Sequence, residues 1–103
     1  AQAALSILVP LAKQAPDDYA LNYTLARTYR LAGNFAAAEQ QTQWLLDLRP
    51  TYPGGLWEAG LLRAQFNDPH GALEMLTAAF RATPAVRLDD RLALLADLAQ
   101  VHD

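Results

Sequence analysis

The sequence contains no cysteine, which excludes disulfide bridges, thiol catalysis and thiolate metal sites. Histidine is scarce, since His70 and His102 are the only two. Lys13 is the single lysine, and the other basic residues are arginines. No apolar run approaches the roughly 18 residues that a membrane-spanning helix requires. The absence of thiols leaves the redox compartment undetermined, and nothing in the sequence indicates the localisation.

Charge of one sign is also limited, because the 103 residues carry a net charge of only −3. Such a mild balance argues against a nucleic-acid binder or a polybasic membrane-surface module. Hydrophobic residues make up 52% of the chain, as in globular proteins, and the length suits a single domain. The sequence begins at an alanine in the middle of a pattern, so we expect it to be a fragment of a longer, bacterial-type protein.

Four sets of residues recur with a step of 34 residues, which is the signature of a repeat protein. Prolines recur in one set and alanines in a second, while two further sets are mostly leucine. The four sets are Pro16, Pro50 and Pro84; Ala4, Ala38 and Ala72; Leu11, Leu45 and Ala79; and Leu8, Thr42 and Leu76.

Each position of this repeat has a physical explanation. The prolines follow apolar-periodic runs and stop helices there. The alanines, together with Ala26 and Gly60 on the preceding helices, allow two helices to approach closely. Gly33 and Asn67 tolerate the left-handed conformation that ends a helix. N-caps are expected at the acidic or amide residues Asp17, Asp18, Asn34 and Asp68, and Pro69 is expected at a first helical position.

The pattern resembles the tetratricopeptide repeat family, whose motif is W-x2-L-G-x2-Y…A-x3-F…P. One unit reads Asn22-x2-Leu25-Ala26-x2-Tyr29…Ala38-x3-Thr42…Pro50, and the next reads Leu56-x2-Ala59-Gly60-x2-Arg63…Ala72-x3-Leu76…Pro84. Departures are Asn22 and Leu56 in place of Trp, Arg63 in place of Tyr, and Thr42 in place of Phe. The resemblance covers nearly the whole chain.

This resemblance implies an all-α fold of antiparallel helix-turn-helix repeats, stacked as a short right-handed superhelical solenoid. We expect helices at residues 4–15, 19–32, 35–48, 56–66, 69–82 and 87–101, with 51–55 as a connection. The single domain, 1–103, then divides into the second half of a repeat (1–16), two full repeats (17–50 and 51–84) and a terminal helix (85–103).

No arrangement of residues indicates catalysis, a cofactor or a metal site, so we expect a protein that is not an enzyme. The two histidines fall in different elements, and His70 is expected to be exposed in a first helical turn. The Asp17–Asp18 and Asp89–Asp90 pairs lie at helix starts, where capping and the helix dipole explain them. The Gly54–Gly55 pair lacks the Lys-Ser/Thr of a phosphate loop and is expected to be a turn.

A binding surface is the remaining functional feature, because the first helices of stacked hairpins line a concave side. The resemblance places Tyr23, Arg27 and Arg30 on that side in one repeat, Trp57 and Leu61 in the next, and Arg91 with Leu88 in the last helix. Aromatic residues and arginine dominate binding hot spots. One interpretation is therefore a groove for a protein or peptide with apolar and acidic groups. In the other, the aromatics pack against neighbouring helices and the arginines bridge carboxylates.

The family members that clamp the C-terminal carboxylate of heat-shock chaperones use Lys, Asn and Arg at set positions. The matching residues here are Ala20, Thr24, Gly54 and Glu58, so the resemblance does not extend to that ligand.

Two alternatives remain open from the sequence. The chain could be a structural or self-assembly segment of a longer array, with contacts through its terminal helices at Leu5 and Leu8, and at Leu94, Leu98 and Val101. It could also be a non-catalytic appendage of an enzyme or of a secretion or assembly protein.

Overall fold

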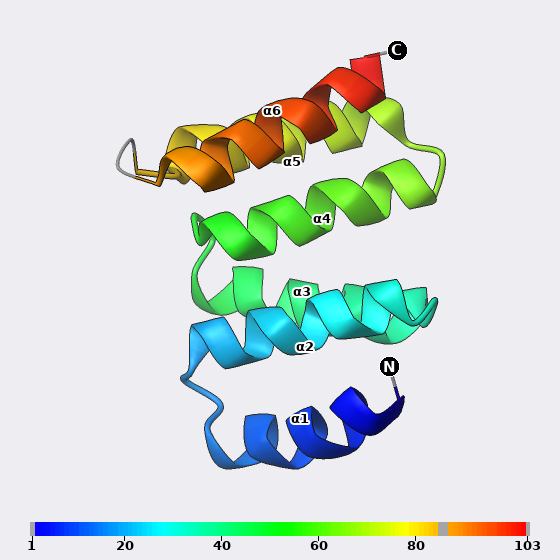
Figure 1. Cartoon of the computed structure of the whole chain (residues 1–103), viewed down its shortest axis with the longest axis vertical. Coiled ribbons are helices and arrows are strands. Elements are labelled where there is room, and N and C mark those ends of the chain that lie inside the picture. The colour runs from blue at the N-terminus through cyan, green and yellow to red at the C-terminus, as the bar shows by residue number, and fades with distance from the viewer. Residues whose placement is uncertain (1, 85–86, 103) are drawn as a thin grey trace.

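Residues 2–84 and 87–102 are described by the computed structural model and form six α-helices without any β-strand (Figure 1). The helices are α1 (Gln2–Gln14), α2 (Tyr19–Leu31), α3 (Phe35–Leu48), α4 (Pro53–Gln65), α5 (Pro69–Ala82) and α6 (Leu88–His102). None of these six helices is both long and apolar enough to cross a lipid bilayer. The predicted all-α class is confirmed.

Each helix packs against the next along the chain, from α1 on α2 to α5 on α6, and α2 also contacts α4. Figure 1 shows the consequence: the helices stack along the long axis, with α1 at one end and α5 and α6 at the other. Contacts that are mostly between sequence neighbours define a helical-repeat solenoid. This confirms the predicted stack of helical hairpins.

Small residues lie where the two helices of a hairpin cross. Ala26, Ala38 and Ala72 are fully buried, and Gly60 is buried as well. A Cβ atom on Gly60 would lie 2.7 Å from Cγ of Leu76, closer than packed atoms approach. Small side chains at these two repeat positions therefore set how closely the helices approach, as predicted for Ala26, Ala38, Gly60 and Ala72. The prediction is wrong for Ala4, which is exposed on α1.

The ends of the helices follow the predicted turn chemistry. Asp18, Asn34 and Asp68 are N-caps, and their side-chain oxygens accept backbone N–H groups of α2, α3 and α5 respectively. Gly33 has φ +82° and Asn67 has φ +61°, so both adopt the left-handed conformation. These polar residues therefore define where α2, α3 and α5 begin.

The start of α4 differs from the prediction, since the helix begins at Pro53 and contains Gly54 and Gly55 in its first turn. The predicted connection at 51–55 and the predicted Gly–Gly turn are therefore wrong. Tertiary contact explains the glycines: a Cβ on Gly54 would lie 2.8 Å from the Tyr23 ring, and one on Gly55 would lie 3.0 Å from Leu46. Pro53 supplies the favoured first helical residue.

Helix α1 exposes apolar side chains, as predicted, but they are not the residues expected. Ile7 is 62% exposed and Leu11 is 44% exposed, whereas Leu5 and Leu8 are half-buried. The inner stripe of α1 faces α2, and the outer stripe faces away from it.

Helix α6 likewise has two apolar stripes. The stripe of Leu94, Leu98 and Val101, which was expected to make contacts outside the chain, packs into the core instead. Leu94 is fully buried and, with Leu98 and Val101, belongs to the cluster around Leu76 and Ala79. The exposed leucines are Leu92 and Leu95. The side chains of Leu88 and His102 lie outside the described part of the structure.

Candidate functional site

The first helices of the hairpins, α2, α4 and α6, lie on one side of the stack, with α3 and α5 behind them in Figure 1. We call the surface formed by these three helices the front face. The described part of the front face has a hollow near the N-terminal ends of the helices and another between α4 and α6. The predicted groove residues belong to these helices.

The first hollow is a pocket of about 440 Å³ with an aromatic wall. Tyr23, Tyr52 and Trp57 line it together with Arg87 and Asp90 from the start of α6. The other lining residues are small or of intermediate size, namely Ala20, Thr24, Pro53, Gly54, Thr83 and Pro84. Two of the predicted site residues, Tyr23 and Trp57, therefore share one cavity.

Tyr23 is half-buried between α2 and α4. Its ring meets that of Tyr52 edge-on, with centroids 6.5 Å apart, and it lies over Gly54. Burial, and then the neighbouring Glu58 carboxylate, raise the pKa of Tyr23 above its ordinary value. Burial likewise raises the pKa of Tyr52, on whose ring the Arg49 guanidinium stacks at 5.6 Å. Both phenols are therefore neutral hydrogen-bonding groups at neutral pH.

Trp57 is held in place by a hydrogen bond across the front face. Its indole Nε1–H donates to Oδ2 of Asp97 on α6 at 2.7 Å. The ring also packs against the core cluster that contains Leu56 and Leu94. This residue therefore lines the pocket and at the same time joins α4 to α6.

Arg30 is committed to an ion pair within the protein. Its Nε and Nη2 donate to the two carboxylate oxygens of Glu58 at 2.6 and 3.1 Å, a bidentate pair that links α2 to α4. Glu58 is only 1% exposed. The guanidinium therefore compensates a buried carboxylate, which matches the sequence alternative in which arginines bridge acidic residues.

The remaining predicted residues have different environments. Arg91 stacks on Phe80 with its guanidinium carbon 4.4 Å from the ring centroid. Leu61 packs partly against the core and lines the second hollow, a pocket of about 420 Å³, together with Asp97 and Val101. Arg27 is exposed on α2, one turn beyond Tyr23. Among the predicted arginines, Arg27 is the one on the solvent surface.

Arg87 and Asp90 were missed as pocket residues. Arg87 Nη2 lies 2.8 Å from Oδ2 of Asp90, so the two form an exposed ion pair at the start of α6. A sequence signal did exist, because the step of 34 residues places Arg87 in register with Pro53, at the start of α4. Because capping and the helix dipole already explained Asp89 and Asp90, a pocket at the start of α6 was not predicted.

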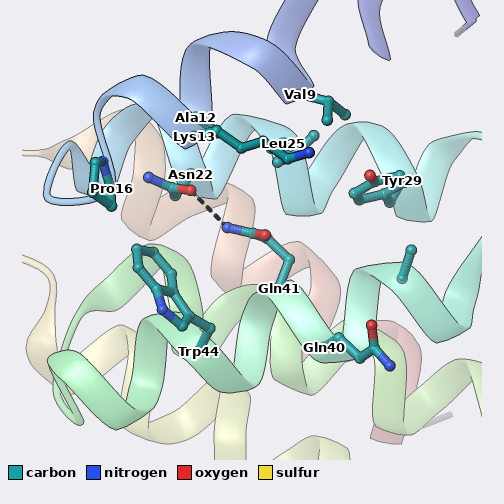
Figure 2. A pocket seen from close by; sticks show the side chains of 11 residues that line it. Val9, Ala12, Lys13, Pro16, Asn22, Leu25, Tyr29, Gln40, Gln41 and Trp44 are labelled. Carbon is teal, nitrogen blue, oxygen red and sulfur yellow. Dashed lines mark hydrogen bonds between the residues drawn. The ribbon is translucent and has the colours of Figure 1, made fainter. Parts of the chain in front are cut away.

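A separate groove of about 400 Å³ lies between α1 and α3, with α2 as its floor (Figure 2). Figure 2 shows Trp44, Gln40 and Gln41 on the α3 side and Asn22, Leu25 and Tyr29 on α2. Helix α1 contributes Val9, Ala12 and Lys13, and Pro16 and Ala37 complete the lining. We call this the α1–α3 groove. No motif in the sequence pointed to it.

In the described part of the chain, histidine and carboxylate side chains form no group of three or more that could hold a metal ion. His70 is exposed, as predicted, and its Nε2 lies 2.9 Å from the Glu74 carboxylate one turn later. An exposed pair of this kind contributes little energy.

No protein-family model matches this sequence, and a comparison with curated proteins finds no match either. Any function must therefore be inferred from the side chains of the grooves themselves.

Proposed function

We propose that this chain is a tetratricopeptide-type, non-catalytic protein-interaction module whose front face binds a peptide or partner segment with apolar and acidic groups. The observation that carries the proposal is the pocket of about 440 Å³ in which Tyr23, Tyr52 and Trp57 meet the exposed Arg87. Tyr, Trp and Arg are enriched in binding hot spots because they combine large contact area with directional polar groups. An aromatic-walled pocket suits an apolar side chain of the partner.

The cations on the front face divide into two groups by their surroundings. Arg27 is exposed and can meet an acidic residue of the partner, whereas the exposed Arg87 is paired with Asp90 of the same pocket. Arg30 and Arg91 are engaged with Glu58 and Phe80, so they hold the helices in position rather than contact the partner. Preorganised helices reduce the entropy lost on binding. Tyr23, Trp57 and Arg27 are the direct contacts in this proposal, and Leu61 extends the surface toward the second hollow.

A charge reversal tests this proposal. Peptides selected from a random display library would be titrated against the wild type and against Arg27→Glu. We expect the selected sequences to combine apolar and acidic residues, and the variant to bind them at least about fivefold more weakly, as for one exposed ion pair lost and one repulsion gained.

The matched control is Arg81→Glu, which makes the same charge change at an exposed position on α5. Equal affinities of the wild type, Arg27→Glu and Trp57→Ala, each with an intact helical spectrum, would disprove the front-face site. Arg30→Glu is unsuitable, because it would place two carboxylates together where Glu58 is buried.

A self-assembly role is the second candidate, favoured by the exposed Ile7 and Leu11 on α1 and Leu92 and Leu95 on α6. Sedimentation at increasing protein concentration separates the candidates. A strictly monomeric chain argues against self-assembly and leaves the peptide-binding proposal standing.

A further inference from the structure

At three positions of the α1–α3 groove, the residue is smaller or more polar than the apolar residue at the equivalent position of the next repeat. A step of 34 residues relates Ala12 to Leu46, Asn22 to Leu56, and Gln41 to Met75. In the next repeat, Leu56 belongs to the hydrophobic core cluster, and Leu46 and Met75 pack against it. The fold can therefore close this place with apolar side chains, and in the first repeat it does not.

A partly buried polar pair replaces the apolar filling. Gln41 Nε2 donates to Oδ1 of Asn22 at 2.7 Å (Figure 2), and Asn22 is only 3% exposed. Asn22 Nδ2 donates to the backbone oxygens of Ala15 and Asp18 at 3.3 and 2.9 Å. Replacing both members of such a pair with apolar groups is often neutral or stabilising. Stability alone therefore does not explain the amide pair.

The pair leaves hydrogen-bonding capacity directed at the groove. Asn22 uses both of its N–H donors and its oxygen, whereas Gln41 uses one N–H. Among the described residues, the other N–H and the carbonyl oxygen of Gln41 have no hydrogen-bond partner. A free donor beside a free acceptor matches a peptide group. Gln40 and Tyr29 add further polar groups to the lining.

The remaining lining defines the side chains that would fit. Val9, Leu25 and Trp44 supply an apolar floor and wall. Among the described residues that line the groove, Lys13 is the one with a charge, and none is a carboxylate. Asn22 and Tyr29 lie seven residues apart on α2, so the floor is about 10 Å long at 1.5 Å per residue. An extended chain covers that length with about three residues.

We propose that the α1–α3 groove binds a short extended peptide segment that carries a large apolar side chain beside a carboxylate. The apolar side chain lies against Leu25 and Trp44, the peptide group bonds to Gln41, and the carboxylate meets Lys13. This site is separate from the front face, so the chain contacts a partner, or two partners, on two of its surfaces.

The test uses Trp44 as a reporter. Because the chain has two tryptophans, Trp57→Phe leaves Trp44 as the single tryptophan, whose emission is separated from that of the four tyrosines by selective excitation. The probes are acetyl-Leu-Leu-Asp-amide and its neutral analogue acetyl-Leu-Leu-Asn-amide. We expect a saturable change in Trp44 emission, with the acidic peptide bound about three- to fivefold more tightly, the range of one exposed ion pair. Lys13→Gln should abolish that preference.

The groove is then narrowed with the pair Asn22→Leu and Gln41→Met, which copies two of these three positions of the next repeat. We expect this double variant to keep its helical spectrum and to lose the Trp44 response. If it does not fold, the comparison of the two probes on the Trp57→Phe protein with and without Lys13→Gln still tests the proposed carboxylate contact. A missing response, equal affinities for the two probes, or a response lost in Arg27→Glu but kept in Lys13→Gln would overturn the proposal.

Discussion

Gly60 lets α4 approach α5, and its replacement is expected to reveal how strongly the repeat geometry constrains this crossing. A Cβ at this position would lie 2.7 and 2.8 Å from Cγ and Cδ2 of Leu76, and 3.2 Å from its backbone nitrogen. Leu76 is fully buried, so its side chain cannot turn away into solvent. Gly60→Ala should therefore push the two helices apart.

The magnitude follows from two opposing effects. Overpacking a core costs about 1–3 kcal/mol. Alanine is about 1 kcal/mol better than glycine inside a helix. Because Leu76 is fully buried and cannot turn aside, we expect the overpacking cost to exceed the helix gain, with a net loss of up to about 2 kcal/mol in the free energy of unfolding. Urea denaturation followed by circular dichroism measures this loss.

A double-mutant cycle identifies the contact responsible. In a Leu76→Ala background the two side-chain atoms at 2.7 and 2.8 Å are gone, while the backbone nitrogen at 3.2 Å remains. Gly60→Ala should therefore cost clearly less than in the wild type, or become stabilising by up to about 1 kcal/mol. The first repeat already contains such a compensated pair, with Ala26 and Thr42 at the same two repeat positions. If Gly60→Ala has the same effect in both backgrounds to within about 0.5 kcal/mol, the proposed contact is not what constrains the crossing.

Three further outcomes follow from the capping, ion-pair and titration chemistry. Asp18→Ala should lower the free energy of unfolding in urea by about 0.5–2 kcal/mol because it removes an N-cap. Asp17→Ala, at an exposed neighbour that is not the cap, should change it by no more than about 0.5 kcal/mol. Equal losses in the two variants would contradict the cap. Glu58→Gln should cost about 1–3 kcal/mol because the partly buried Arg30 loses its charged partner, and an unchanged urea midpoint would refute the pair's role. The pKa of Tyr23 is raised by burial, so its contribution to stability is complete below the unfolded pKa of 10.0 and is lost as the pH rises through the folded pKa. Tyr23→Phe should therefore reduce the loss of stability at alkaline pH. The absorbance titration of the wild type should contain a late-ionising phenol that the variant lacks.

The repeat step made most of the fold predictable. Prolines and turn residues gave the ends of the helices, and the bounds of α3 and α5 are as predicted, because Asn34 and Asp68 mark their starts unambiguously. The start of α4 was misjudged since a Gly–Gly pair is typical of turns. Only the positions of Tyr23 and Leu46 show that these glycines make room for neighbouring side chains.

The front face was predictable only in part. Helical spacing placed Tyr23 and Trp57 on a common surface, and the structure brings them into one pocket. Spacing could not show that Arg30 turns toward Glu58, because that pair joins residues 28 positions apart. Stripe patterns also could not decide which side of α6 is buried, since both stripes are leucine-rich.

The measurement that most directly tests the stacked arrangement is a nuclear Overhauser spectrum of the side-chain N–H protons. The solenoid predicts a contact from the Arg30 Nε–H to the Glu58 side chain and one from the Trp57 indole N–H to the Asp97 side chain, since these pairs bridge α2 to α4 and α4 to α6. The absence of both contacts, with contacts between α1 and α6 in their place, would indicate a closed helical bundle and contradict the solenoid.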